Sequence, residues 1–149
     1  MLWHAPWGGR EWLAGVRVLD AFAGTGAMGL EALSRGAPHA TFLENDRAAL
    51  VALRANIAAC GADAVVIAGD ATRPPRATAP MGLVFLDPPY AQGLVPRALA
   101  ALHDAGWMAP GAVIVAEHGR EEAMPPPPGF ELLAERAQGA GAVTVLRAG

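Results

Sequence analysis

Short apolar runs alternate along the chain with longer segments in which apolar residues recur about every three or four positions. The short runs are rich in Val, Leu and Ile and have the length of strands that are buried on both faces. They comprise residues 16–20, 40–44, 64–68, 83–87 and 113–117. Segments with the period of amphipathic helices lie between several of these runs, at residues 27–35, 46–59 and 94–102. This alternation predicts an α/β protein with a doubly wound, mostly parallel sheet.

The C-terminal part of the chain has a different pattern. Residues 130–135 and 142–146 have no helical segment between them, which predicts an antiparallel hairpin joined by residues 136–141. The proline run at 125–128 cannot form a helix or a central strand, so we expect a stiff connector into this hairpin. The whole chain, residues 1–149, is predicted to form a single domain.

Composition narrows the classes of protein that the chain can represent. A net charge of −3 excludes a basic protein that coats nucleic acid. The single cysteine, Cys60, excludes an internal disulfide framework, and we expect it to be a small buried residue near the end of a helix. The sequence contains neither a signal-peptide pattern nor an apolar stretch long enough to span a membrane. A cytoplasmic protein without a membrane partner is therefore predicted.

A glycine-rich segment from Asp20 to Gly29 follows the first predicted strand. Gly24, Gly26 and Gly29 fit the G-x-G-x-x-G pattern, and Glu44 ends the next strand, where an acceptor for ribose hydroxyls is expected. Such glycines let the backbone approach a ligand, and the helix that follows offers free N–H groups to an anion. The pattern fits a dinucleotide and S-adenosylmethionine equally. Asp20 favours the second ligand, because its carboxylate could accept from an ammonium and would repel a pyrophosphate.

A second motif, Asp87-Pro88-Pro89-Tyr90, directly follows a predicted buried strand. The two prolines fix the backbone, so the carboxylate and the neighbouring carbonyls are held in one arrangement. A carboxylate and a carbonyl can together accept both N–H groups of an exocyclic amine and direct its lone pair toward an electrophile. The Tyr90 ring could stack on a base that is turned out of its helix. Because ligands of open α/β sheets bind beyond the carboxyl ends of the strands, both motifs and Asp70 predict one site at that edge.

Together these segments resemble the class I S-adenosylmethionine-dependent methyltransferases that modify exocyclic amines. Residues 19–37, residues 84–90 and Gly106-Trp107 are similar to the RsmD family, the bacterial 16S rRNA guanine-N2 methyltransferases, and the similarity extends over residues 16–147. The resemblance implies a Rossmann-like fold with a seven-stranded sheet and a C-terminal antiparallel hairpin. It also implies S-adenosylmethionine as cofactor, S-adenosylhomocysteine as product, no metal, and rRNA in the small ribosomal subunit or its assembly intermediate as partner.

The resemblance further implies a role for each motif residue. The loop from Asp20 to Gly26 would hold the methionine part of the cofactor, Glu44 would bind its ribose, and Asp70 with Ala71 its adenine. The implied cofactor-binding residues are Asp20, Phe22, Ala23, Gly24, Thr25, Gly26, Glu44, Asn45, Asp70, Ala71 and Asp87. The implied catalytic residues are Asp87, Pro88, Pro89 and Tyr90, of which Asp87 and the Pro88 carbonyl would bind the target amine.

The N-terminal part of the chain departs from the family pattern. Family members carry an additional segment with an R-x-R-E-type helix that closes over the cofactor, whereas only residues 1–15 precede the first predicted strand here. We expect these residues, with Arg10-Glu11, to be a remnant of that cover. Trp3, Trp7 and Trp12 are expected to be packing residues.

Other functions remain open on the residues alone. The D-P-P-Y motif also occurs in enzymes that methylate adenine N6 or cytosine N4 of DNA or RNA. An NAD-dependent oxidoreductase would use the same glycine loop but needs a hydride-transfer site, and only His118, beside Glu117, could approach a ligand. We expect His118 instead to support the site or face solvent. A methyltransferase-like module that binds the cofactor without catalysis would have the same motifs.

Overall fold

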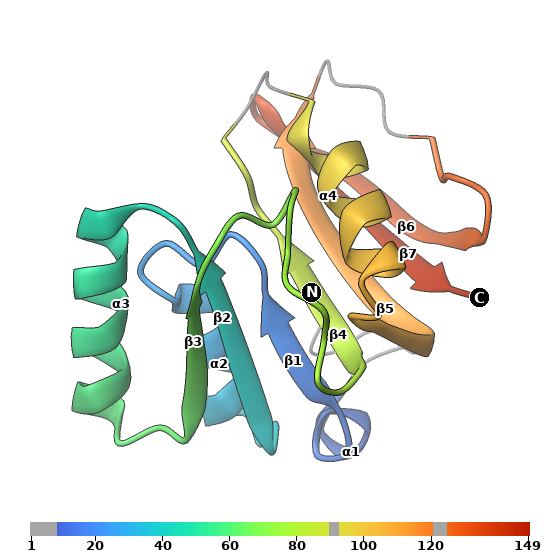
Figure 1. Ribbon diagram of the computed structural model, residues 1–149. Coiled ribbons are helices and arrows are strands. Elements are labelled where there is room, and N and C mark those ends of the chain that lie inside the picture. Colours follow the sequence, from blue (N-terminus) through green and yellow to red (C-terminus); the bar gives the residue numbers. More distant parts are fainter. Residues whose placement is uncertain (1–8, 90–92, 121–124) are drawn as a thin grey trace.

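The computed structural model describes residues 9–89, 93–120 and 125–149, in which helices and strands alternate as the sequence predicts (Figure 1). The helices are α1 (Arg10–Leu13), α2 (Ala27–Ser34), α3 (Arg47–Cys60) and α4 (Leu94–Asp104). The strands are β1 (Arg17–Asp20), β2 (His39–Glu44), β3 (Ala64–Ala68), β4 (Met81–Leu86), β5 (Met108–Gly119), β6 (Phe130–Gln138) and β7 (Gly141–Ala148).

The strands form one seven-stranded sheet in the order β3-β2-β1-β4-β5-β7-β6. Strands β1 to β5 pair in parallel, whereas β7 lies antiparallel to both β5 and β6. This confirms the predicted mostly parallel sheet with its C-terminal hairpin. The chain order reverses between β1 and β4, and open α/β sheets bind their ligands at such a switch point.

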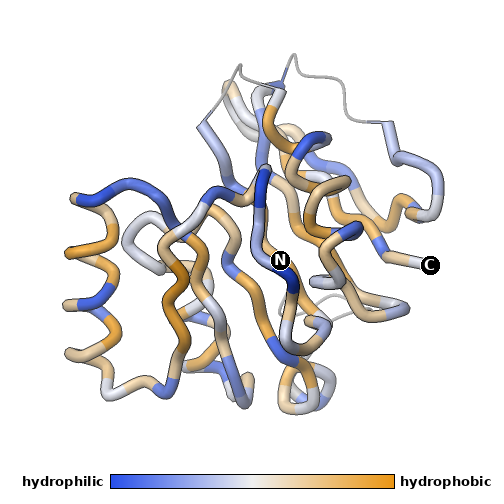
Figure 2. The backbone as a smooth tube through the Cα atoms, viewed as in Figure 1, coloured by the Kyte–Doolittle hydropathy of each residue, from blue (hydrophilic) through white to orange (hydrophobic). Residues whose placement is uncertain are grey.

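Helices cover both faces of the sheet, and each face has its own core. Alternate strand residues contribute to opposite cores, as neighbouring Val18 and Leu19 do in β1. Residues of α4 such as Leu99 complete one core, and residues of α1, α2 and α3 such as Leu53 complete the other. Figure 1 shows α4 in front of the sheet and α2 behind it, and Figure 2 shows apolar residues along the central strands. Burial on both faces explains why the strands are nearly continuous apolar runs.

The connection from β3 to β4 contains no helix among its described residues. The backbone N–H of Ala77 donates to the carbonyl of Ala105 at 2.9 Å, and the indole N–H of Trp107 donates to the carbonyl of Pro75 at 2.8 Å. Trp107 is buried, so this bond satisfies a polar group inside the core. This connection, which contains Pro74 and Pro75, is therefore held against the region that follows α4.

The N-terminal helix α1 is a single turn that packs on the same side of the sheet as α2 and α3. Leu13 is buried in the core on the side of α2 and α3, and Trp12 packs against that core. The prediction of Trp12 as a packing residue is therefore confirmed, whereas Trp3 and Trp7 lie outside the described residues. No helix of the described part of the chain is both long enough and apolar enough to cross a membrane.

The structure corrects three local predictions. The hairpin strands are longer than expected, so that β6 and β7 are joined by only Gly139 and Ala140. Strand β5 begins at Met108 rather than at residue 113, because its first part also pairs with β4, with a shift of register after Met108. Cys60 is exposed rather than buried, because burial decreases along α3 toward its C-terminal turn.

Candidate functional site

Acidic and polar residues line the carboxyl edge of the sheet, the upper edge in Figure 1, in the spatial order of the strands. Asp70 follows β3, Glu44 ends β2, the glycine loop follows β1, Asp87 follows β4 and Glu117 lies near the end of β5. One cavity of about 750 Å³ connects them. It is lined by Phe22, Gly24, Glu44, Asn45, Asp46, Asp70, Thr72, Asp87, Pro88, Pro89, Leu94, Arg97 and Glu117.

The three glycines of the loop after β1 have different structural requirements. Gly24 adopts a φ of 55° with open space where a side chain would stand, and it lines the cavity. Gly26 adopts a φ of 87°, and a Cβ atom there would overlap the side chain of Leu53. A Cβ atom at Gly29 would overlap the ring of Phe42. Gly24 therefore leaves room for a ligand, whereas Gly26 allows the loop to pack on α3 and Gly29 allows α2 to pack on β2.

Asp20 ends β1 beneath this loop and is only 3% exposed. Its Oδ2 accepts from the backbone N–H of Gly29 in the first turn of α2, at 3.0 Å. Burial raises the pKa of Asp20 to about 7, the Gly29 hydrogen bond opposes the rise, and the nearby Asp87 and Glu44 add to it. The carboxyl group therefore titrates near neutral pH and is positioned to gain from a cationic neighbour.

Glu44 connects β2 to the glycine loop through its carboxylate. Oε1 accepts from the backbone N–H of Gly24 at 2.7 Å. Oε2 accepts from the backbone N–H groups of Asn45 at 3.1 Å and Asp46 at 2.8 Å. These bonds fix the carboxylate at the cavity wall and leave lone pairs for one or two hydroxyl donors.

Asp70 follows β3 and is held by the turn that it starts. Its Oδ1 accepts from the backbone N–H and the hydroxyl of Thr72, both at 2.8 Å. These hydrogen bonds lower the pKa of Asp70, burial opposes them slightly, and Arg73 and Arg97 add to the lowering. Asp70 therefore stays ionised at the end of the cavity beside β3.

Asp87 and Glu117 lie side by side at the other end of the cavity. Leu86 pairs with Ala116, so the residues that follow them on β4 and β5 are neighbours, and their carboxyl groups are hydrogen-bonded to each other. Burial raises the pKa of Glu117, and the charge and the hydrogen bond of Asp87 raise it further. The protonated form of Glu117 is therefore favoured beside Asp87.

The structure brings most of the predicted site residues to this cavity. Those that line it are Phe22, Gly24, Glu44, Asn45, Asp70, Asp87, Pro88 and Pro89. Four predicted residues are buried behind the wall, namely Asp20, Ala23, Gly26 and Ala71. Thr25 is exposed, and its carbonyl accepts from the side-chain amide of Asn56 at 2.9 Å. The predicted role of Tyr90 falls outside the described residues.

Sequence reasoning missed five residues that line the cavity, namely Asp46, Thr72, Leu94, Arg97 and Glu117. Glu117 had a signal, because it ends an apolar strand run as Asp20 and Glu44 do. Arg97 and Leu94 lie in the first turn of α4, and nothing in the local sequence marks them. Within the described ranges, no group of three or more His, Cys, Asp or Glu side chains could hold a metal ion.

His118 points away from the cavity, because successive side chains of a strand face opposite sides of the sheet. It is 5% exposed, and its Nε2 lies 2.8 Å from the hydroxyl of Thr144 on β7. Its Nδ1 lies 3.0 Å from the carbonyl of Gly119. With both ring nitrogens engaged inside the protein, His118 supports the C-terminal strands and offers no group for hydride transfer.

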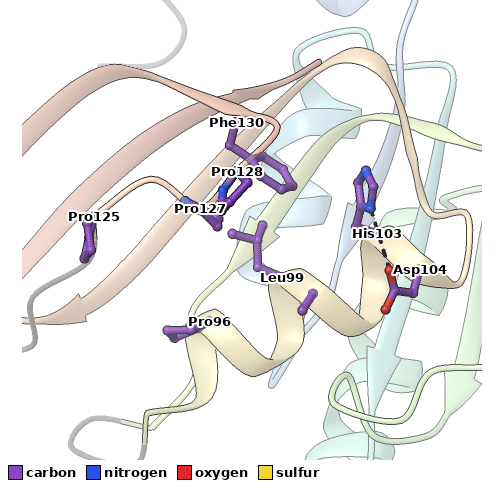
Figure 3. Close-up of a pocket in the computed structure, with 9 residues that line it drawn as sticks. Pro96, Leu99, His103, Asp104, Pro125, Pro127, Pro128 and Phe130 are labelled. Atoms are coloured by element: carbon purple, nitrogen blue, oxygen red, sulfur yellow. Dashed lines mark ion pairs between the residues drawn. The ribbon is translucent and has the colours of Figure 1, made fainter.

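A second cavity, of about 390 Å³, lies between α4 and the proline run that precedes β6 (Figure 3). Its walls include Leu99 and Pro128, and His103 meets the ring of Phe130 edge-on with ring centres 5.6 Å apart. None of its lining residues belongs to either predicted motif. The cavity at the carboxyl edge is therefore the candidate site.

Comparisons with known proteins show the family to which the chain belongs. Residues 5–147 match the profile of the family described as conserved hypothetical protein 95. The ribosomal RNA small subunit methyltransferase D of Escherichia coli is 41% identical over 124 residues, which are 79% of this chain and 63% of that protein. This chain thus spans less than two thirds of the length of that relative.

Solved structures show the same fold. A provisionally named methylase of Haemophilus influenzae has a TM-score of 0.85 and 30% identity, covering 93% of this chain and 90% of that chain. A provisionally named methyltransferase of Escherichia coli, yhhF, has a TM-score of 0.83 and 37% identity, covering 93% and 82%. The fold is that of the class I methyltransferases, and the chain belongs to the RsmD family.

Proposed function

We propose that this chain binds S-adenosylmethionine at the carboxyl edge of its sheet and methylates an exocyclic amine of a nucleobase. The observation that carries the proposal is the position of the Asp87-Pro88 motif in the same cavity as the glycine loop and Glu44. A cofactor in contact with the loop and an amine in contact with Asp87 would meet at the centre of that cavity. The methyltransferase names of its relatives support methyl transfer as the reaction.

The polar groups of the cavity fit the parts of this cofactor. Gly24 leaves the space that a Cβ atom would fill, Glu44 keeps lone pairs for the two ribose hydroxyls, and Asp70 stands at the end where the adenine would lie. Asp20 is buried behind the loop and would gain a counter-charge from the ammonium of the methionine part. The acidic lining would repel a pyrophosphate, which argues against a dinucleotide.

The cofactor, when bound, supplies a methyl group on a sulfonium, which is already a good leaving group. Catalysis by the chain's own residues is then mainly orientation. Asp87 and the Pro88 carbonyl would each accept one N–H of the amine and leave its lone pair facing the methyl group. On methylation the amine nitrogen would become cationic, and Asp87 would stabilise that charge until the proton passes to solvent at this exposed carboxylate.

The substrate within this class is guanine N2 of 16S rRNA in the small ribosomal subunit. Support comes from the name of the Escherichia coli relative and from the similarity of both motif loops to the RsmD family. A net charge of −3 suits an enzyme that acts on one base of a folded ribonucleoprotein better than one that grips long stretches of RNA. No specific observation favours a second function.

The decisive test is methyl transfer from radiolabelled S-adenosylmethionine to small ribosomal subunits from a strain that lacks the corresponding enzyme. Nuclease digestion and mass spectrometry would identify the methylated base and its position. We expect one methyl group per subunit, on guanine N2. Methylation of adenine N6 or cytosine N4 would contradict the proposed base, and thermal stabilisation by NAD but not by S-adenosylmethionine would contradict the whole proposal.

A further inference from the structure

The order of the strands places Glu117 beyond the position of the target amine. The row along the sheet edge begins with Asp70 at β3 and passes Glu44 and the glycine loop before it reaches Asp87 at β4. Glu117, at β5, is the next acidic residue in this row and lines the same cavity. If the cofactor occupies the part from β3 to β1 and the amine lies at Asp87, the side of the base that carries the amine extends toward Glu117.

The side chain of Glu117 is only partly buried, and its hydrogen-bond partner is Asp87. Burial and the adjacent Asp87 both favour its protonated form. A protonated Glu117 donates its O–H to the Asp87 carboxylate and retains a carbonyl oxygen as an acceptor. An ionised Glu117 is also an acceptor, so the cavity offers two adjacent acceptor groups, Asp87 and Glu117, in either protonation state.

The nucleobases differ at the ring position next to their exocyclic amine. In guanine the N2 amine stands beside the N1–H donor, so two donors lie next to each other. In adenine the N6 amine stands beside the N1 acceptor, and in cytosine the N4 amine stands beside the N3 acceptor. Two adjacent acceptors on the protein therefore match guanine. Adenine and cytosine would instead place the lone pair of a ring nitrogen against a lone pair of the protein acceptor.

We propose that Glu117 is the residue that selects guanine, by accepting its N1–H while Asp87 and the Pro88 carbonyl hold the N2 amine. This inference rests on the proposed function and assigns the choice of base within that site to a residue of β5. Selection follows the rule that a site built to accept from a substrate N–H rejects the analogue that lacks it. Glu117 acts on the choice of base, and Asp87 acts on the nitrogen that reacts.

The test compares two bases that both carry an amine at C2. Small subunits are reconstituted with 16S rRNA that holds either guanine or 2-aminopurine at the nucleotide mapped in the transfer assay. 2-Aminopurine keeps the amine but has an unprotonated N1. We expect the unmodified chain to prefer guanine by at least about tenfold in kcat/KM. Glu117→Met fills similar space without an acceptor, and it should bring this ratio close to one through loss of activity on guanine.

Two further variants separate selection from general support of the site. Glu117→Gln should keep the preference for guanine, because its amide N–H can donate to Asp87 while its carbonyl accepts N1–H. Glu135→Gln removes an exposed carboxylate of β6 and should leave kcat/KM unchanged on both guanine and 2-aminopurine. Calorimetry with S-adenosylmethionine should give similar affinities for all variants, which would show that each one is folded.

Several results would overturn the inference and leave the proposed function standing. One is a similar loss of kcat/KM on guanine and on 2-aminopurine in Glu117→Met. Another is a preference for guanine that Glu117→Gln loses as completely as Glu117→Met does. A third is an unmodified chain that does not prefer guanine. Absence of transfer by the unmodified chain to subunits that contain guanine would instead contradict the proposed function, and the inference would fall with it.

Discussion

The two ends of the candidate site are built in opposite ways. At the end beside Gly24, where the cofactor is proposed to bind (the cofactor end), backbone N–H groups already hold the carboxylates in place. Glu44 accepts from Gly24 and from the two residues that follow Glu44, and Asp20 accepts from Gly29. At the opposite end, where the methyl-accepting amine is proposed to bind, the exposed Asp87 has the Glu117 carboxyl group as its hydrogen-bond partner. One end is part of the fold, and the other is a pair of groups available to a substrate.

In the proposed function, this difference separates cofactor binding from methyl transfer. Hydrogen bonds from backbone N–H groups to carboxylates are each worth about 1.5–3 kcal/mol, so the loop around Gly24 is held in place before any ligand arrives. A preformed cradle binds a cofactor without a large ordering cost. The Asp87 and Glu117 pair contributes little to the fold and can redirect its acceptors toward an amine. Changes at the two ends should therefore have different consequences.

The largest effect is expected from Asp87→Ala. In the proposed mechanism this variant loses the carboxylate that orients the amine and stabilises its developing charge, so kcat for methyl transfer should fall by about 10²–10³-fold or more. Because Asp87 is exposed and its partner is a side chain rather than the glycine loop, the calorimetric Kd for S-adenosylmethionine should stay within about threefold. A parallel loss of cofactor binding would contradict the separation of the two ends.

A smaller effect is expected from alanine at the two glycines of the cofactor loop with positive φ. Gly26→Ala combines a strained φ of 87° with overlap onto Leu53. It should lower the free energy of unfolding in urea by about 2–4 kcal/mol. Gly24 has a φ of 55° and open space around it, so Gly24→Ala should lower the free energy of unfolding by only about 1 kcal/mol. The methyl group of Gly24→Ala would instead project into the cavity and weaken cofactor binding about tenfold or more.

These two variants are matched controls for each other. If Gly24→Ala were the more destabilising of the two, the loop would be tightly packed at the cavity rather than against α3. If Gly24→Ala left the affinity for S-adenosylmethionine unchanged, the cofactor would not approach the backbone there. Either result would contradict the view that the cofactor end of the cavity is a preformed cradle.

Much of the fold follows from the sequence, because strands buried on both faces must be short apolar runs. The run that ends at Asp20 and the run that ends at Glu44 could each be placed, and with them one edge of the sheet. The D-P-P motif and the glycines carry their own backbone constraints, so the position of Asp87 and Gly24 in one site was also predictable. Local geometry and strand length were enough for this part of the structure.

The remainder depends on neighbours that the local sequence does not specify. Glu117 becomes a partner of Asp87 only through the register of β4 on β5. Cys60 continues the spacing of the buried Leu53, yet it is exposed because burial decreases along the last turns of α3. The burial of Asp20 likewise follows from packing on both sides of β1. Pairing register and the extent of cover over a helix are tertiary properties, so spacing alone could not predict these features.

The smallest effect is expected from Asp20→Asn, and it depends on pH. The folded protein holds the proton of Asp20 up to about pH 7, whereas the unfolded chain releases it near 3.8, so wild-type stability falls as the pH rises between these values and then levels off. Asparagine keeps an oxygen for the Gly29 N–H without a charge to desolvate. In urea unfolding near pH 8, the free energy of unfolding of the variant should be about 1–3 kcal/mol higher than that of the wild type. Near pH 4 this difference should disappear. A wild type that gains stability relative to the variant as the pH rises would contradict the burial of this carboxyl group.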